Sequence, residues 1–326
     1  MRNRARIAPL AGLSLIGVLL SGASVGAAGK PAPPITGGAA TKTAPPPTGG
    51  TFPPLTNCPI FPATNVWNRR VDSLPVAVNS STMIAAMGSA IALHPDFSAA
   101  HRYGIPYNVV GPSTPRSAVT FLYDDESDHV GYPVPPAPIQ ERGSDHHILM
   151  VDTTACRLYE LFDAAKNGSW TAGSGATWDL TSNALRPDTW TSADAAGLPI
   201  FPGLVRFEEI RAGQILHALR FTAPTTCNGY IYPARHEAGS TSCSSYPPMG
   251  LRVRMKASVN ITGFAPDVRV LLQAMKTYGM LLADNGSAWY VSGAPDRRWN
   301  DDVLHTLNQV HGSDFEVVDT TGFVNG

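Results

Sequence analysis

The stretch SDHHILMVDTTACRLYELFDA, residues 144–164, decides the fold class. Two runs of aliphatic, β-branched and aromatic residues flank a short polar segment, which is typical of a β-hairpin. A loop of two residues, Thr153 and Thr154, or of four residues gives one register, with His147 opposite Glu160. The sequence therefore predicts an antiparallel pair of strands.

Glu160 is the most informative residue of this hairpin. Side chains alternate along a strand, so Glu160 shares a face with the apolar Leu158 and Phe162. A carboxylate on such a face needs a partner, and an opposed His147 lies close enough to supply it. A carboxyl group tuned by burial and by an imidazole suits acid/base catalysis, and a structural ion pair is the alternative interpretation.

Similar apolar runs recur between Gly and Pro turns, with no alternating helical pattern. This spacing predicts a mostly β domain, an antiparallel β-sandwich or barrel-like fold with a few packing helices, and disfavours a parallel β/α architecture. The other expected strands are 105–110, 118–123, 214–221, 230–232 and 251–256.

Three helices are expected from apolar periodicity and from their terminal residues. They run from Ser81 to Leu93, from Pro266 to Gly279, and from Asn300 to just before Gly312. Between the last two, Asp284-Asn285-Gly286 separates two apolar runs and predicts a second hairpin. In that hairpin Asp284 and Asn285 are expected to be turn residues.

The N-terminus indicates export. Three arginines precede an apolar run of about 14 residues and then small residues, so residues 1–28 are predicted to be a cleavable signal peptide. Residues 29–54, rich in Pro, Gly and Thr, form the expected linker, and 55–326 the expected single β-rich globular domain. The mature protein is expected to be secreted and extracellular, with no membrane association after signal cleavage.

The four cysteines favour disulfides, because exported chains meet an oxidising compartment. Cys227 and Cys243 bracket a Gly-, Ser- and Pro-rich loop and are expected to pair. Cys58 is then left to pair with Cys156. Zinc is the alternative, but no C-x-x-C occurs and no metal site or cofactor is expected.

Charge restricts the partner class. Removing the three leader arginines from the 24 Lys and Arg residues leaves 21 against 25 Asp and Glu, a net charge of about −4. Nucleic-acid binding, which requires a basic surface, is disfavoured. The expected partner is an extracellular polysaccharide, and the sequence leaves the oligomeric state unknown.

A second group of acids follows the hairpin, in or near loops. Asp194 and Glu208 are candidates for the second carboxylate of a glycosidase. Trp178 and Trp190 flank this region, and their indole rings are suited to stacking on sugar rings. Helix capping by Asp194 and simple solvation of Glu208 are the competing interpretations.

A lyase would need cations and an imidazole or phenol. His217, Arg220, Arg235 and His236 are the candidates, with a cation neutralising a uronate and a ring moving the proton. Further along, Arg252, Arg254 and Lys256 alternate with apolar residues, which predicts a cationic strand face covered by carboxylates, an acidic ligand or solvent.

The phrases FPATNVWN, SGATWDL, WTSADAAGLPI, HALRF and ADNGSAWYVSG together resemble an uncharacterised family of exported bacterial β-rich proteins. The resemblance covers most of residues 58–319 and implies a shared domain, but it brings no activity. Paired carboxylates favour a glycoside hydrolase with Glu160, His147, Asp194 and Glu208 as catalytic residues. The alternatives are a polysaccharide lyase, a carbohydrate-binding or cell-surface module, and a structural envelope protein.

Overall fold

The computed structural model describes residues 58–323. The predicted signal peptide, the linker and the first residues of the predicted domain lie outside the described residues. Strands form three sheets, and no sheet within 58–323 closes into a barrel. Strand residues outnumber helical ones, as expected for a mostly β protein.

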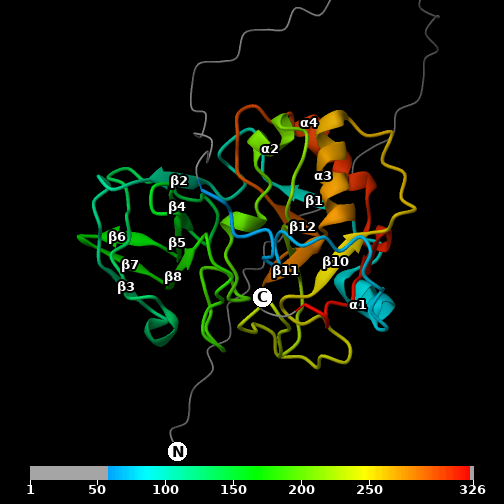
Figure 1. Cartoon of the computed structure of the whole chain (residues 1–326), viewed down its shortest axis with the longest axis horizontal. Coiled ribbons are helices and arrows are strands. Elements are labelled where there is room, and N and C mark those ends of the chain that lie inside the picture. Colours follow the sequence, from blue (N-terminus) through cyan, green and yellow to red (C-terminus); the bar gives the residue numbers. More distant parts are fainter. Residues whose placement is uncertain (1–57, 324–326) are drawn as a thin grey trace, which may run out of the picture. The chain divides into compact units, whose positions relative to one another are not determined.

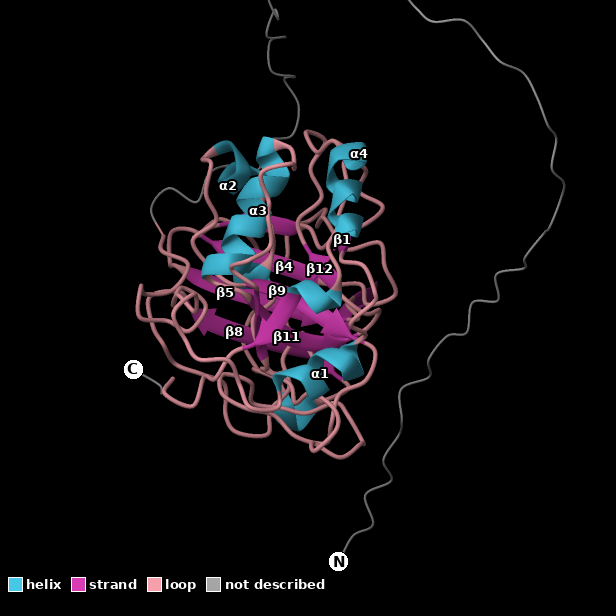
Figure 2. Cartoon of the chain, turned by 90° about the vertical axis from the view of Figure 1, so that its right-hand side faces the viewer, coloured by secondary structure: helices cyan, strands magenta, loops and turns pink. Residues whose placement is uncertain are grey.

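A six-stranded sheet carries most of the helices around it (Figure 1). Its strands, in spatial order, are β1 (His94–Asp96), β12 (Tyr290–Ser292), β9 (Leu219–Ala223), β11 (Met280–Asn285), β10 (Arg252–Met255) and β13 (Phe315–Val317). The helices are α1 (Ser80–Met87), α2 (Phe207–Arg211), α3 (Pro266–Thr277) and α4 (Asp301–Leu304). In the view of Figure 2, α2, α3 and α4 gather above the strands and α1 lies below them.

Two smaller sheets lie on the other side of the molecule (Figure 1). The four-stranded sheet is ordered β2 (Tyr107–Val110), β4 (Ile148–Asp152), β5 (Arg157–Phe162) and β8 (Ser174–Asp179). The three-stranded sheet is ordered β3 (Val119–Phe121), β7 (Ser169–Ala172) and β6 (Ala165–Asn167). Short 3₁₀ turns complete the structure at Asp124–Glu126, Phe201–Gly203, His305–Gln309 and Gly312–Asp314.

The expectation of purely antiparallel sheets is wrong. Strands β1 and β12, β9 and β11, β2 and β4, and β3 and β7 pair in parallel, so all three sheets are mixed. Parallel partners arise because strands distant in the sequence insert beside one another, and the spacing of apolar runs carries no information on that pairing.

The hairpin predicted at Asp284-Asn285-Gly286 is also wrong, because β9 lies between β11 and β12. β9 pairs in parallel with β11 and antiparallel with β12, supplying hydrogen-bond partners to both. The connection instead passes the end of β9, where Gly286 N donates to Ala223 O at 3.0 Å.

The three predicted helices form with different extents. The best match is α3, which begins at Pro266 and has Gly279, at φ 70°, just beyond its end. α1 is shorter than predicted and stops at Gly88, which has φ 97°. The third begins as predicted, because the Asn300 side chain accepts from Val303 N at 3.2 Å, and it continues as a 3₁₀ helix to Gln309.

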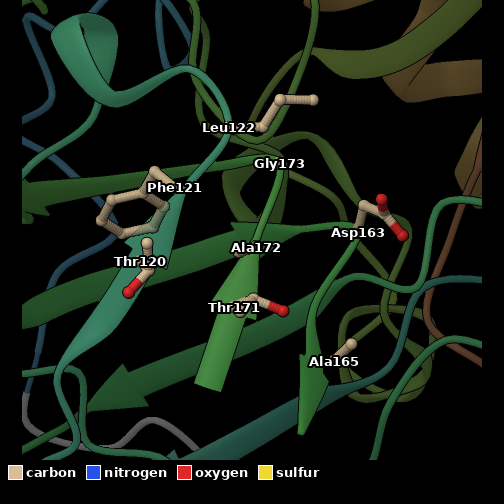
Figure 3. A pocket seen from close by; sticks show the side chains of 8 residues that line it. All are labelled: Thr120, Phe121, Leu122, Asp163, Ala165, Thr171, Ala172 and Gly173. Atoms are coloured by element: carbon tan, nitrogen blue, oxygen red, sulfur yellow. The ribbon is translucent and has the colours of Figure 1, made fainter. Parts of the chain in front are cut away.

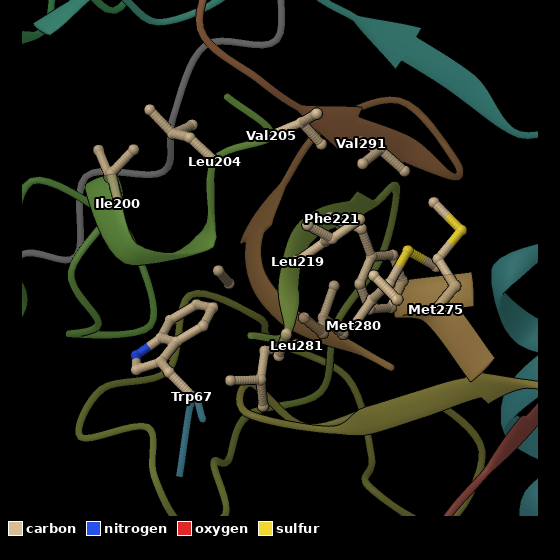
Figure 4. Close-up of a cluster of buried hydrophobic side chains, with 14 of the residues drawn as sticks. Trp67, Ile200, Leu204, Val205, Leu219, Phe221, Met275, Met280, Leu281 and Val291 are labelled. Carbon is tan, nitrogen blue, oxygen red and sulfur yellow. The ribbon is translucent and has the colours of Figure 1, made fainter. Parts of the chain in front are cut away.

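The main core packs against the six-stranded sheet (Figure 4). Leu219, Phe221, Met280 and Val291 from its strands are fully buried there. A second, smaller core lies between the four-stranded and three-stranded sheets and includes Ile148, Met150 and Tyr159. The strand β4 is therefore buried on both faces, with Leu149 and Val151 facing the main core.

Both predicted disulfides are present, joining Cys58 to Cys156 and Cys227 to Cys243. They are compatible with an extracellular protein. Within 58–323 no helix has both the length and the apolar character needed to cross a bilayer.

Candidate functional site

Arg220 lies at the centre of the candidate site and is 4% exposed. Its Nε and Nη2 donate to the two carboxylate oxygens of Asp194, each at 2.7 Å. Nη2 also donates to Oδ2 of Asp284 at 3.1 Å, and Nη1 donates to the hydroxyl of Ser292 at 2.6 Å. One guanidinium thus joins two carboxylates. Asp194 is buried, whereas 22% of the Asp284 side chain is exposed.

A β-bulge aims Asp284 at Arg220. Strand β11 follows β9 in register up to Leu282 and then skips Ala283, so that Asp284 lies opposite Thr222. Thr222 is two residues beyond Arg220 in β9, which puts Asp284 on the Arg220 face. Without the extra residue, Asp284 would point to the opposite face of the sheet.

The bulge also fixes the loop that carries Asp194. The carbonyl oxygen of Ala283 accepts from Ala196 N at 2.9 Å. The Ser192 hydroxyl contacts the carbonyl oxygens of Asp194 and Leu198 at 2.8 and 2.6 Å. These bonds hold the buried carboxylate of Asp194 against Arg220.

Glu160 lies behind this cluster, on the core face of β5, and is fully buried as its apolar neighbours predicted. Its carboxylate accepts from Ile200 N at 2.9 Å and from Phe201 N at 2.8 Å. Burial raises the pKa of Glu160 to about 7, although the two amide donors oppose the change. Glu160 therefore ties the four-stranded sheet to the loop that follows Asp194.

The predicted register of the β4–β5 hairpin is wrong by two residues. Asp152 pairs with Arg157 and Leu149 pairs with Glu160. The loop is four residues long but starts at Thr153, one residue later than expected, because Asp152 still pairs and its side chain accepts from the loop amides. A slip of two residues keeps each side chain on the same face of the sheet, so His147 still lies on the face of Glu160. The charge of His147 opposes the rise in the pKa of Glu160.

His147 is paired with Glu141, which the sequence analysis did not single out. Its Nδ1 donates to Oε2 of Glu141 at 2.6 Å and its Nε2 donates to the carbonyl oxygen of Ala193 at 2.9 Å. Burial lowers the pKa of His147, but the hydrogen bond and charge of Glu141 outweigh it and raise the pKa to about 9. Burial raises the pKa of Glu141, but the bond from His147 outweighs it and the pKa is lowered.

Asp284 has the opposite protonation tendency. Burial and the negative charge of Asp194 raise the pKa of Asp284 to about 8, against the opposing charge of Arg220. Arg220 also lowers the pKa of Glu141, which is 14% exposed. One guanidinium thus acts on two partly exposed carboxyl groups, of which Asp284 retains its proton near neutral pH and Glu141 is ionised.

Two further acids lie near this site. Asp96 in β1 is aligned with Ser292 in β12, and burial raises its pKa. The charge of Asp145 contributes to the raised pKa of Asp284. No set of three or more His, Cys, Asp or Glu residues within 58–323 is arranged to hold a metal ion.

Glu208 and His217 belong to a different cluster, at α2. Glu208 accepts from Arg298 at 2.7 Å and is 40% exposed. His217 contacts the carboxylate of Glu209 at 2.9 Å, and Arg206 donates to the same carboxylate. None of these bonds joins the α2 cluster to Asp194, Arg220 or Asp284.

Arg235 and His236 pack behind the loop of Asp194. Arg235 pairs with the exposed Asp188 at 2.9 Å, and Nδ1 of His236 donates to the carbonyl oxygen of Ala195 at 2.8 Å. The four residues proposed for a lyase are therefore held by different partners.

The two candidate sugar-stacking tryptophans enclose Arg186. Its guanidinium lies 5.8 Å from the ring centroid of Trp178 and 5.5 Å from that of Trp190. Trp178 is 5% exposed and belongs to the main core, whereas Trp190 is half-buried. The pair does not form an exposed aromatic row.

The cationic strand β10 is covered from within the chain. Arg252 is 1% exposed and donates to the carbonyl oxygens of Val66, Arg69 and Tyr278. Arg254 donates to Glu316 at 2.9 Å. The predicted covering carboxylate is present for Arg254, while backbone carbonyl groups cover Arg252.

Glu141 and Ser292 are not among the residues predicted for the site, and Asp284 was expected to be a turn residue. Local pattern carried no signal for them, because the site depends on β9 inserting between β11 and β12. No protein-family model, curated protein or solved structure matches this chain.

Proposed function

We propose that this protein is a secreted hydrolase of an extracellular polysaccharide, with Asp284 as general acid and Glu141 as general base. The observation that carries the proposal is a pair of partly exposed acids held by buried cationic side chains: Asp284 accepts from Arg220 at 3.1 Å, and Glu141 accepts from His147 at 2.6 Å. Burial raises the pKa of Asp284, whereas at Glu141 burial is outweighed by the bond from His147 and the pKa is lowered. Glycosidases use two carboxyl groups whose environments separate their pKa values in this way.

The proposed reaction uses each group once. The Asp284 carboxyl donates its proton to the glycosidic oxygen as the bond from that oxygen to the anomeric carbon breaks. Glu141 takes a proton from the water whose oxygen forms the new bond to the anomeric carbon. Glu141 then releases its proton to solvent and Asp284 takes one up, so that the net reaction is the addition of one water across one glycosidic bond.

The buried residues act as positioning residues in this proposal. Asp194 keeps the pKa of Asp284 high and holds Arg220, while His147 holds Glu141 and keeps it ionised. Glu160 is 0% exposed and has no route to substrate, so its role is to anchor the loop at Ile200. We therefore assign the chemistry to Asp284 and Glu141 in place of the set expected from the sequence, which was Glu160, His147, Asp194 and Glu208.

A hydrolase is favoured over a lyase by the charge balance. A lyase must neutralise a uronate with a free cation, but Arg220 already makes a bidentate pair with the buried carboxylate of Asp194. The acids Asp96 and Asp145 would also repel an anionic sugar. A neutral polysaccharide is consequently the expected substrate.

The test uses the full chain on cellulose, xylan, mannan, chitin and polygalacturonate, with release of reducing ends as the readout. We expect activity on a neutral polymer, a loss of at least about 100-fold in Asp284→Asn and in Glu141→Gln, and activity within about two-fold of wild type in the exposed control Asp72→Asn. Full activity in Asp284→Asn would refute the assignment. No release from any polymer, or an unsaturated uronate product, would refute the hydrolase.

A further inference from the structure

A hollow of about 350 Å³ lies on the three-stranded sheet (Figure 3). The pairing of β3, β7 and β6 aligns Thr120, Thr171 and Ala165 in one row across the sheet, and all three are exposed. Leu122 at the edge is 76% exposed. The volume of the hollow is at the lower end of the range for small-ligand sites.

The lining has the chemistry of a neutral sugar site. Two threonine hydroxyls can donate and accept, the carboxylate of Asp163 accepts, and Leu122 offers an apolar surface. No Lys, Arg or His is among the residues that line it. Hydroxyl-rich, uncharged ligands suit this set, whereas a uronate would find no cation and would meet the charge of Asp163.

Two backbone hydrogen bonds join the edge of the hollow at Asp163 to the segment that precedes His147. Asp163 N donates to the carbonyl oxygen of Asp145 at 2.7 Å, and Ala164 N donates to that of His146 at 3.3 Å. Asp145 is close enough to Asp284 for its charge to raise the pKa of that carboxyl. His146 and Asp163 both have φ 47°, in the left-handed region that His and Asp enter more often than most residues and that recurs at ligand sites.

One aromatic ring links the hollow to the His147–Glu141 pair. The ring of Phe162 lies 5.7 Å from that of His147, centroid to centroid. A Cβ at Gly173, which lines the hollow, would lie 2.5 Å from this ring. Only glycine leaves both the hollow and the packing of Phe162 intact.

We propose that this hollow is a distal subsite that binds a sugar unit of the same neutral polysaccharide whose bond is cleaved at Asp284. This inference rests on the proposed function, which identifies the polysaccharide that would occupy the hollow. A polymer would extend from Asp284 past Asp145 and Asp163 to the threonine row. The hollow would thereby favour long chains over short ones.

The experiment measures binding separately from turnover. Calorimetry with the Asp284→Asn protein uses cellohexaose, xylohexaose, mannohexaose and chitohexaose as probes. Thr120→Val together with Thr171→Val removes both hydroxyls and retains β-branched side chains, and Asp163→Asn retains a residue that tolerates positive φ. The matched control is Thr321→Val, an exposed threonine outside the hollow.

At least one hexasaccharide is expected to bind, with affinity at least five-fold weaker in the double threonine variant and unchanged in Thr321→Val, since lost hydrogen bonds weaken binding. Unchanged affinity in the double variant, or no binding by any probe, would overturn the subsite. Binding that depends on the threonines without any release of reducing ends by wild type would retain the subsite and remove the hydrolase. Hydrolysis by wild type, together with binding that does not depend on the threonines, would retain the hydrolase and remove the subsite.

Discussion

Asp194 and Asp284 share one nitrogen of Arg220, whose Nη2 lies 2.7 Å from Oδ1 of Asp194 and 3.1 Å from Oδ2 of Asp284. The two acids come from different parts of the chain, and only Asp284 is partly exposed. The shared cation holds two negative groups close together, and their repulsion favours a proton on one of them. Burial and this repulsion together raise the pKa of Asp284 to about 8.

Replacing Asp194 with asparagine should lower the pKa of Asp284, because it removes a neighbouring negative charge. Within 58–323, Asp284 then becomes the only carboxylate paired with Arg220. Carboxyl carbon NMR titration measures that pKa, and the basic limb of the activity profile should move to lower pH with it. Losing one partner of a buried pair should also cost about 3 kcal/mol of stability. An unchanged or higher Asp284 pKa would contradict this account, and Asp188→Asn at an exposed pair is the control.

Stability should fall as pH rises, in one window for Glu160 and one for His147, and the raised pKa of Asp284 adds a loss that overlaps both. Glu160 has a folded pKa near 7 against an ordinary 4.5, so the folded protein binds the extra proton between these values and loses stability as pH rises through them. His147 has a folded pKa near 9 against 6.5, so its contribution is complete below 6.5 and lost as pH rises through 9. Each contribution is on the order of 3 kcal/mol.

Urea unfolding from pH 4.5 to 10 measures both windows. Glu160→Gln should weaken the dependence between pH 4.5 and 7, where Asp284 still contributes, and His147→Gln should weaken it between 6.5 and 9. Each variant serves as the control for the other window. A wild-type stability that rises with pH through these ranges would be inconsistent with both assignments.

The two disulfides should differ in their contribution to stability. Cys58–Cys156 closes a separation of 98 residues and Cys227–Cys243 one of 16. Chain entropy predicts losses of about 4.7 and about 3 kcal/mol when each pair is replaced by alanine. Denaturant unfolding of the two double variants tests this order, and a larger loss for Cys227–Cys243 would contradict it.

Local pattern predicted several elements well. The strand Arg157–Phe162 has the expected bounds, and α3 begins at the expected proline. The apolar face of Glu160 was also correct, because alternation along a strand depends only on neighbouring residues. The predicted register of the β4–β5 hairpin was wrong, because the last pair before the turn depends on the hydrogen bonds of Asp152 to the loop.

The amino-acid sequence by itself determined the mostly β class, both cysteine pairs and the burial of Glu160, because composition, spacing and alternation are properties of the chain. Only the tertiary structure decided where Asp284 points. Its direction depends on β9 entering between β11 and β12 and on the skipped Ala283. Such pairing is set by contacts between segments far apart in the chain, which no local pattern records.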